Sequence, residues 1–185
     1  MALALPPEPR LEPALRARGI ALLPGGSLAA WARVSRLQRP ALLLAPGADF
    51  QEARGVLVRL GPPLSLRAAQ EGIWLARQQG LPLTLAWVEG PPEAGYLEGP
   101  YFSPSLWRAA RERAWQSLEG PLEGARRAGV AAQGGLYSSQ AFLREARRQG
   151  LVVLGMPRRG LRWGWAGRVA SLLGGGALGV LVVIG

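Results

Sequence analysis

The sequence predicts an α/β protein with three layers, in which a doubly wound, mostly parallel five-stranded sheet over residues 54–185 has helices on both faces. Short runs of Leu, Val and Ile alternate with helix-like segments along the chain, and this alternation is typical of parallel sheets. The runs are apolar at every position instead of every second one. Both faces of each strand must therefore be covered.

The first half of this region contains two strands and two helices. Residues 54–60 are a strand by length and composition, and glycine and proline end it. A serine cap and a glycine stop predict a helix over residues 65–79, and residues 83–88 form the second strand. A loop rich in Gly and Pro leads to a helix over residues 105–127, which we expect to be interrupted around Gly120 and Pro121.

The second half continues the alternation with three further strands. In chain order we expect a strand at 130–136, a helix from Ser138 or Ser139 to Arg148, a strand at 151–154, a helix at 161–173 and a strand at 180–184. Either serine can cap its helix through the side-chain oxygen. A nucleophilic role for them is not expected, because the chain has no His or Lys to activate a hydroxyl.

Residues 1–53 repeat the last part of the same scheme. RLEPALRARGIALLPG resembles AFLREARRQGLVVLGM, and GSLAAWARVSRLQRPALLLAP resembles GRVASLLGGGALGVLVVIG, in the same order. We interpret residues 1–53 as a partial αβαβ repeat that packs on a main domain of residues 54–185. Two unrelated helix–strand pairs would also look alike in a chain so rich in Leu, Ala and Arg, so this alternative stays open.

The residue types that are missing exclude most enzyme classes. All 22 basic residues are arginine, and with 12 acidic residues they give a formal charge of +10. The chain has no Cys, His, Lys or Asn. Zinc sites of Cys or His, His-activated nucleophiles, Schiff-base lysines and the P-loop lysine are therefore excluded. We expect a protein that is not an enzyme and has no metal site or cofactor of its own.

The two ends of the chain bear on its location. The stretch MALALPPEPRLEP lacks the basic and long apolar regions of a secretory signal, so a cytoplasmic protein is expected. The last 17 residues, VASLLGGGALGVLVVIG, carry no charge. Because glycines divide them into a helix end, a turn and a strand, we do not expect a membrane span.

At the level of whole segments, the chain resembles the universal stress protein family. VLVRLGPPLSLRAAQEGIWLARQQGLPLTLAWVEG resembles the first strand, helix and second strand of that family. The segment from RRAGV to VASLL resembles its third strand through fourth helix, and VLVVIG its closing strand. The resemblance covers residues 54–185. Gly26-Ser27-Leu28-Ala29 and PALLLAP resemble the tail of a preceding copy, as in tandem members.

The resemblance implies an architecture, a partner and a class of function. The strand order would be 3-2-1-4-5, with a ligand crevice between the first and fourth strands. Residues 41–45 would lie beside the closing strand, as in dimers of the family, and the protein would be a homo-oligomer. Its function would be that of a stress-response or regulatory module that acts by binding.

The nucleotide-binding motif of the family is incomplete here. Nucleotide-binding members have an Asp after the first strand, and a loop G-x2-G-x9-G-[ST] after the fourth whose bare backbone approaches phosphate. This chain has Gly61 at the Asp position, or Leu60 if the register shifts by one, together with Arg158 for the second glycine and a loop shortened by one residue. The resemblance allows ATP as a ligand, although we expect it not to bind in the usual way. The degenerate site comprises Gly61, Gly155, Arg158, Arg159, Gly160, Gly167 and Arg168.

The arginines of this loop leave two interpretations open. In one, the site has decayed and the arginines form a solvated face of a basic protein. In the other, guanidinium groups replace amide donors and bind an anionic small molecule, such as a phosphorylated metabolite or nucleotide. The arginines concerned are Arg158, Arg159, Arg162 and Arg168.

Two further functions are alternatives. Trp163 and Trp165 lie among these arginines, and aromatic residues interleaved with arginine across residues 158–168 are compatible with nucleic-acid binding. Carboxylates in the long loop after the second strand could instead act as general acid and base or hold magnesium, although their spacing does not select them. They are Glu89, Glu93 and Glu98.

Overall fold

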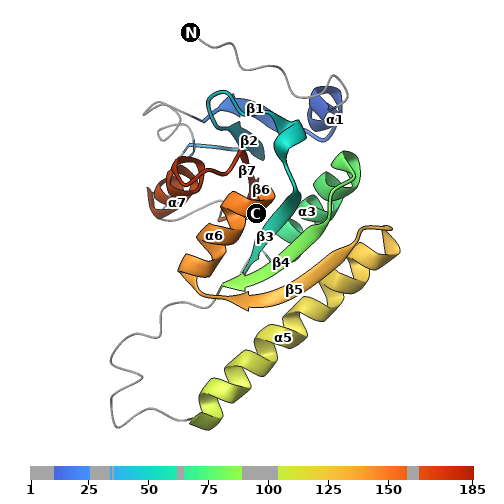
Figure 1. Cartoon of the computed structure of the whole chain (residues 1–185), viewed down its shortest axis with the longest axis vertical. Coiled ribbons are helices and arrows are strands. Elements are labelled where there is room, and N and C mark those ends of the chain that lie inside the picture. The colour runs from blue at the N-terminus through green and yellow to red at the C-terminus, as the bar shows by residue number, and fades with distance from the viewer. Residues whose placement is uncertain (1–10, 26–33, 35, 62–64, 89–103, 158–162) are drawn as a thin grey trace.

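In the computed structural model, one seven-stranded sheet runs through the molecule (Figure 1). The structure describes residues 11–25, 34, 36–61, 65–88, 104–157 and 163–185. The helices are α1 (Leu11–Ala17), α3 (Ser65–Gln79), α5 (Pro104–Arg127), α6 (Ser139–Gln149) and α7 (Trp163–Gly174), with the 3-10 turn η1 (Phe50–Glu52). The strands are β1 (Ala21–Pro24), β2 (Ala41–Leu44), β3 (Gly55–Leu60), β4 (Leu83–Val88), β5 (Ala132–Tyr137), β6 (Gly150–Met156) and β7 (Gly179–Ile184).

The strand order confirms the predicted topology and extends it. The sheet runs β1-β2-β7-β6-β3-β4-β5, so the five strands of residues 54–185 have the order 3-2-1-4-5. All four neighbouring pairs among these five are parallel. The sheet has seven strands instead of five because β1 and β2 continue it beyond β7. Strand β2 pairs antiparallel with β7 and parallel with β1.

The amino-terminal segment is joined to the rest through this pairing and through α1. Ala41–Leu44 pairs with Gly179–Val182, which agrees with the expected position of residues 41–45 beside the closing strand. The Arg18 guanidinium donates to both carboxylate oxygens of Glu71 in α3, at 2.6 and 3.2 Å, and lies 4.9 Å from the ring centroid of Trp74. A domain boundary at residue 53 stays a prediction.

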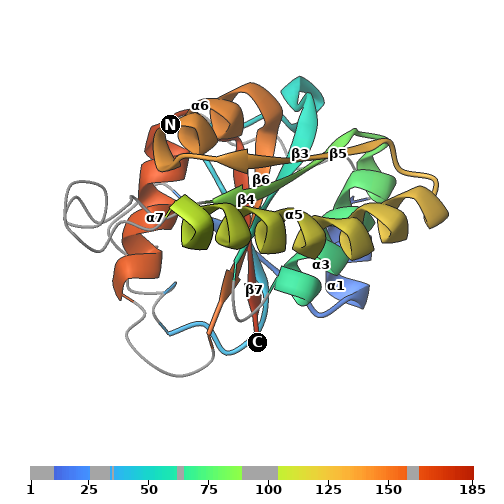
Figure 2. The same ribbon diagram turned by 90° about the horizontal axis from the view of Figure 1, so that it is seen from below.

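Helices cover both faces of the sheet, as Figure 2 shows most clearly. Buried residues of α1, α3 and α5 pack on one face and those of α6 and α7 on the other. Within β3, Val56 and Val58 face the first cluster and Leu57 the second, because successive side chains of a strand point to opposite faces. This confirms the prediction that uniformly apolar strands are covered on both sides.

Helix α5 runs without a break through Pro121, so the expected interruption was wrong. Buried Leu118 and Ala125 lie on either side of the proline and belong to the cluster over the sheet. In β5, a Cβ built on Gly134 would lie 3.2 Å from Leu122 and 3.3 Å from Leu118, so the helix packs closely on the strand. This packing holds the helix together although Pro121 lacks an N–H group.

Helix α6 begins and ends close to where the sequence placed its limits. Ser138 is the N-cap, and its hydroxyl oxygen accepts a hydrogen bond of 3.2 Å from the Ala141 N–H group. Gly150 follows the helix with φ of +91°, a conformation that residues other than glycine rarely adopt. Strand β6 begins at this glycine and is three residues longer than the predicted 151–154.

Candidate functional site

The predicted site residues that the structure describes lie at the carboxyl edge of the sheet. Gly61 directly follows β3, and Gly155 lies near the end of β6. Because β3 and β6 are parallel neighbours, their carboxyl ends meet at one edge. Gly167 and Arg168 lie in the first turns of α7, which begins at this edge. Arg158, Arg159 and Gly160 lie outside the described residues.

A pocket of about 360 Å³ opens at this edge, and we call it the carboxyl-edge pocket. Arg59 of β3, Val88 of β4 and Leu154 of β6 contribute from the sheet. Helices α6 and α7 supply the remaining lining residues, which are Ser139, Phe142, Leu143, Gly164, Gly167, Arg168, Ser171 and Leu172. Gly61 and Gly155 are not part of this lining. The structure thus brings two predicted site residues, Gly167 and Arg168, to a pocket of a size suited to small molecules.

Arg59 introduces a charge into this pocket from the sheet. It lies on the same face of β3 as Leu57, which packs against α6 and α7. Its guanidinium carbon lies 5.9 Å from the ring centroid of Trp165, and the guanidinium carbon of Arg168 lies 4.7 Å from the same centroid. Two cations therefore contact one indole ring, and each gains from its π electrons.

The charges of these two arginines are not neutralised by any described acidic side chain. Burial lowers the pKa of Arg59, and the nearby charge of Arg168 lowers it further. Among the ion pairs formed within the described part of the chain, none involves Arg59 or Arg168. None of the described lining residues of the carboxyl-edge pocket carries a carboxylate. The described part of this lining is therefore electropositive.

Two helix ends add to this positive potential. Helices α6 and α7 both begin at the carboxyl edge, and a helix has a partial positive charge at its first turn. Free backbone N–H groups at such ends bind anions. Ser138 uses its hydroxyl oxygen in capping α6, as one of the two predicted serine caps. The arrangement can bind an anion next to an aromatic ring.

Arg59 is the residue of this pocket that sequence reasoning missed. The motif comparison examined Gly61, or Leu60 in the shifted register, and did not consider Arg59. A signal was present, because Arg59 is the only charged residue in the apolar strand GVLVRL. A lone charge near the carboxyl end of a buried strand indicates a ligand edge, but only the paired strands show which helices cover it.

Several other candidates lie outside the described residues. They include Glu89, Glu93 and Glu98, the segment 158–162, and the side chain of Trp163. The carboxylate-based reaction and nucleic-acid binding by 158–168 therefore stay predictions. Elsewhere, the described side chains include no cluster of three or more His, Cys, Asp or Glu that could hold a metal ion. The described helices also include none with the length and apolar character that crossing a membrane requires.

The fold and the pocket define a doubly wound α/β protein with a candidate ligand site at the carboxyl edge of its sheet. No protein-family model and no curated protein sequence matches the chain. Solved structures do match. A protein of the universal stress protein family from Burkholderia pseudomallei is 23% identical, with a TM-score of 0.54, over 71% of this chain and 96% of its own.

Two longer proteins match nearly the whole chain. A universal stress protein from Archaeoglobus fulgidus is 15% identical, with a TM-score of 0.54, over 94% of this chain and 64% of its own. A functionally unknown protein from Pseudomonas aeruginosa is 12% identical, with a TM-score of 0.57, over 92% of this chain and 65% of its own. This chain therefore has the universal stress protein fold, and it spans less than two thirds of the length of either longer protein.

Proposed function

We propose that this chain is a non-catalytic regulatory or stress-response module that binds a phosphorylated small molecule in the carboxyl-edge pocket. Arg59 and Arg168 hold the phosphate, and the indole ring of Trp165 supports both guanidinium groups. The observation that carries the proposal is the convergence of two guanidinium groups on one indole ring, with no described carboxylate to neutralise them.

The electrostatics of the pocket favour an anion. Arg59 is partly desolvated and close to a like charge, which is why its pKa is lowered. A bound phosphate would offset both effects, since each guanidinium can donate two parallel hydrogen bonds to its oxygens. Hydrogen bonds to charged groups contribute about 1.5–3 kcal/mol each when they are well formed. A hydroxyl-bearing or neutral ligand would gain much less.

The same residues disfavour ATP bound in the usual manner of the family. Gly61 has no carboxylate for the nucleoside, and Pro157 has no N–H group to donate to a phosphate. Arg168 follows Gly167, at the position where the family has Ser or Thr. We therefore infer that the site prefers a compact phosphate to an extended triphosphate.

Isothermal titration of the full chain with AMP, ATP and inorganic phosphate tests this function. Arg59→Gln should weaken AMP binding about tenfold, the loss expected for one charge-assisted contact. The matched control is Arg67→Gln, an exposed arginine on α3 at the opposite face of the sheet, which should change affinity less than twofold. Equal affinities in Arg59→Gln and the native chain, or ATP binding far tighter than AMP, would rule the proposal out.

The non-catalytic part of the proposal rests on the groups in the pocket. Its described lining residues include no His, Cys, Lys or carboxylate to act as general base at neutral pH. We expect no release of phosphate from ATP above the rate in buffer. Turnover that Glu89→Gln, Glu93→Gln or Glu98→Gln abolishes would replace this function by a carboxylate-based hydrolysis.

A homo-oligomer is also part of the proposal. Strand β7 is paired with β6 on one side and β2 on the other, so the closing strand has no free edge. Contacts between copies must then use another surface, such as the outer edge of β5. Analytical ultracentrifugation should show a species larger than 19.7 kDa, and a monomer over the whole micromolar range would contradict this.

A further inference from the structure

A second hollow lies at the amino edge of the sheet, at the opposite ends of the strands from the carboxyl-edge pocket. Its volume is about 440 Å³, and its lining includes Arg54, Thr84, Gln133, Arg148 and Gln149. Thr84 and Gln133 lie near the starts of β4 and β5, and Gln149 ends α6. We call this hollow the amino-edge pocket.

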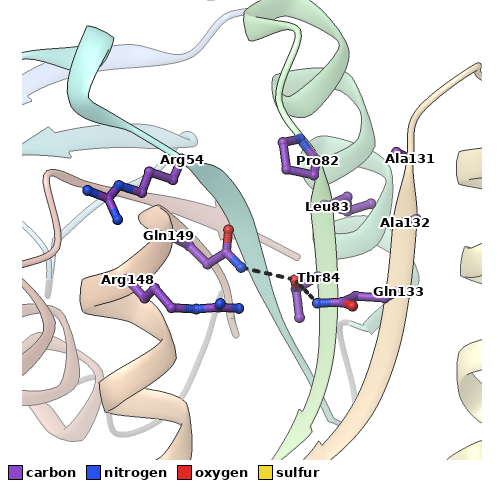
Figure 3. Close-up of a pocket in the computed structure, with 9 residues that line it drawn as sticks. All are labelled: Arg54, Pro82, Leu83, Thr84, Ala131, Ala132, Gln133, Arg148 and Gln149. Atoms are coloured by element: carbon purple, nitrogen blue, oxygen red, sulfur yellow. Dashed lines mark hydrogen bonds between the residues drawn. The ribbon is translucent and has the colours of Figure 1, made fainter.

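Three polar side chains form the floor of the amino-edge pocket, of which Thr84 and Gln149 are buried and Gln133 is exposed. Thr84 and Gln149 are the buried polar residues of the described chain, with 2% and 7% of their surface exposed. The Thr84 hydroxyl oxygen accepts hydrogen bonds of 3.3 Å from the side-chain amides of both Gln133 and Gln149. Figure 3 shows the two glutamine side chains approaching Thr84 from opposite sides. Burying such groups costs free energy unless they are paired, so the fold has to support this floor.

The position of Gln149 is fixed by its surroundings. Its amide nitrogen also donates a hydrogen bond of 2.6 Å to Glu145, one turn earlier in α6. Its amide oxygen lies where a Cβ on Gly55 would be, so the close approach requires glycine at that position. The floor is therefore held in place before any ligand arrives.

Gln133 keeps hydrogen-bonding capacity for a ligand. A carboxamide has two N–H donors and one carbonyl acceptor. Gln133 gives one N–H group to Thr84, and the hydrogen bonds within the described residues use neither the other N–H group nor its oxygen. A neighbouring donor and acceptor match the edge of an adenine ring or a primary amide, which presents the complementary pair.

Arginines outnumber carboxylates around this floor, although Glu145 contacts Gln149. A further hollow of about 790 Å³ adjoins the amino-edge pocket, and Arg54 and Arg148 line both. Its lining adds Arg144 and Arg147, and Glu52 is the acidic side chain among its described lining residues. Arg148 is bound to Glu145, whereas Arg54 forms no ion pair with any described carboxylate. An anionic group next to the floor would therefore be attracted to Arg54 and its neighbours.

We propose that the amino edge is a second ligand site, which binds a phosphorylated compound whose uncharged part carries a neighbouring hydrogen-bond donor and acceptor. The uncharged part lies on the floor formed by Thr84, Gln133 and Gln149. The phosphate lies in the adjoining hollow against Arg54 and Arg147. This site is independent of the carboxyl-edge pocket, because the two share no residue.

Calorimetry with ADP as the probe tests the proposed phosphate contacts of Arg54 and Arg147. The titration uses the full chain with Arg59→Gln and Arg168→Gln, which removes the arginines of the carboxyl-edge pocket. Adding Arg54→Gln and Arg147→Gln should weaken ADP binding about tenfold or more. The matched control replaces Arg67 and Arg77, two exposed arginines of α3, and so removes the same charge. Equal losses in the two sets of variants would mean non-specific attraction and overturn the proposal.

The proposed binding of the uncharged part of the ligand to the floor is tested with Thr84→Val, which removes the oxygen that both glutamines contact. This variant should weaken ADP binding about fivefold but leave inorganic pyrophosphate binding unchanged, because pyrophosphate has no group for the floor. Thr84→Ser keeps the hydroxyl and should bind ADP normally, which separates loss of the contact from loss of folding. In NMR spectra, the side-chain amide signals of Gln133 should shift with ADP. Signals that stay unmoved at saturation would overturn the proposal.

A failure here leaves the carboxyl-edge function untouched. If Arg59→Gln alone abolishes all ADP binding, the amino-edge site does not exist while the proposed function stands. If Arg59→Gln has no effect and Arg54→Gln does, the proposed function falls and the amino-edge site stands.

Discussion

The two edges of the sheet use arginine in different ways. At the carboxyl edge, Arg59 and Arg168 lie against the indole of Trp165 and contact no described carboxylate. At the amino edge, Arg148 donates hydrogen bonds of 3.0 and 2.6 Å to the two carboxylate oxygens of Glu145. The pKa of Arg59 is lowered, chiefly by burial, while the pKa of Arg148 is raised, chiefly by its hydrogen bond to Glu145.

This difference shows that the partner, and not the arginine, decides what the charge does. A guanidinium paired with a carboxylate stabilises local structure and has little capacity left for a ligand. One that lies on an aromatic ring keeps its hydrogen-bond donors and its charge. Arg54 at the amino edge also keeps its charge available to a ligand, because no described acid pairs with it.

The largest difference between the two edges is expected in the unfolding free energy when a glycine is replaced by alanine. Gly55→Ala would place a Cβ on the amide oxygen of Gln149 and displace it from Thr84 and Glu145. Overpacking and the lost hydrogen bonds should lower the unfolding free energy by about 2 kcal/mol. Gly61→Ala at the carboxyl edge meets no atom within 4 Å and should change it by less than about 0.5 kcal/mol. Urea denaturation measures the unfolding free energy of both variants. Equal losses in the two would contradict the expected difference between the edges.

Removing the N-terminal cap of α6 should affect stability through the carboxyl edge alone. Ser138→Ala removes the hydroxyl oxygen that accepts from the Ala141 N–H group and should cost about 1 kcal/mol. Ser139→Ala is the control, because Ser139 is exposed and lies within the helix and not at the cap. It should change the unfolding free energy by only a few tenths of a kcal/mol. Thermal denaturation measures both. The amide signals of Gln149, at the far end of the helix, should stay in place in each variant.

A smaller effect of opposite sign is expected at Arg59. Arg59→Met gives up the attraction between the cation and the Trp165 ring, but it also removes a charge that is partly desolvated and repelled by Arg168, and we expect the second effect to be larger. The unfolding free energy should rise by up to about 0.5 kcal/mol at low salt, a small value because Arg59 is only half-buried and solvent screens it. Arg148→Met should instead destabilise the protein, because it leaves Glu145 without its cation. Destabilisation by both substitutions would remove the distinction between the edges.

The smallest expected effect is the dependence of the unfolding free energy on pH. The hydrogen bond from Arg148 holds the pKa of Glu145 below its ordinary value of 4.5. A depressed carboxyl pKa contributes stability that is complete above the ordinary value and is lost as the pH falls through the folded-state value. The stability difference between the native chain and Glu145→Gln should therefore shrink as the pH drops below 4.5. None of the described lining residues of the carboxyl-edge pocket is acidic, so Arg59→Met should show no such dependence over the same range.

Sequence reasoning predicted the fold well where the pattern is local. Apolar runs, serine caps and glycine stops placed every strand from β3 to β7 within two residues of its observed limits. The order 3-2-1-4-5 came from the family resemblance and is confirmed by the pairing. The break expected around Pro121 was wrong, since contacts of Leu118 and Leu122 with β5 outweigh a missing N–H group.

The candidate sites were predicted less completely. The motif comparison led to Gly167 and Arg168, which line the carboxyl-edge pocket. It missed Arg59, and it gave no role to Thr84, Gln133 or Gln149. These residues come from separate strands and helices, and their contacts depend on strand register and helix packing. A single sequence carries no signal for such contacts.

By itself, the sequence determined the α/β class, the positions of most elements, and the exclusion of His, Cys and Lys chemistry, because these depend on residue type and on spacing along the chain. The tertiary structure alone decided that Arg59 and Arg168 meet at Trp165. It also decided that Glu145 neutralises Arg148. The physical reason is that electrostatic effects depend on distance and burial in space, and the fold sets both.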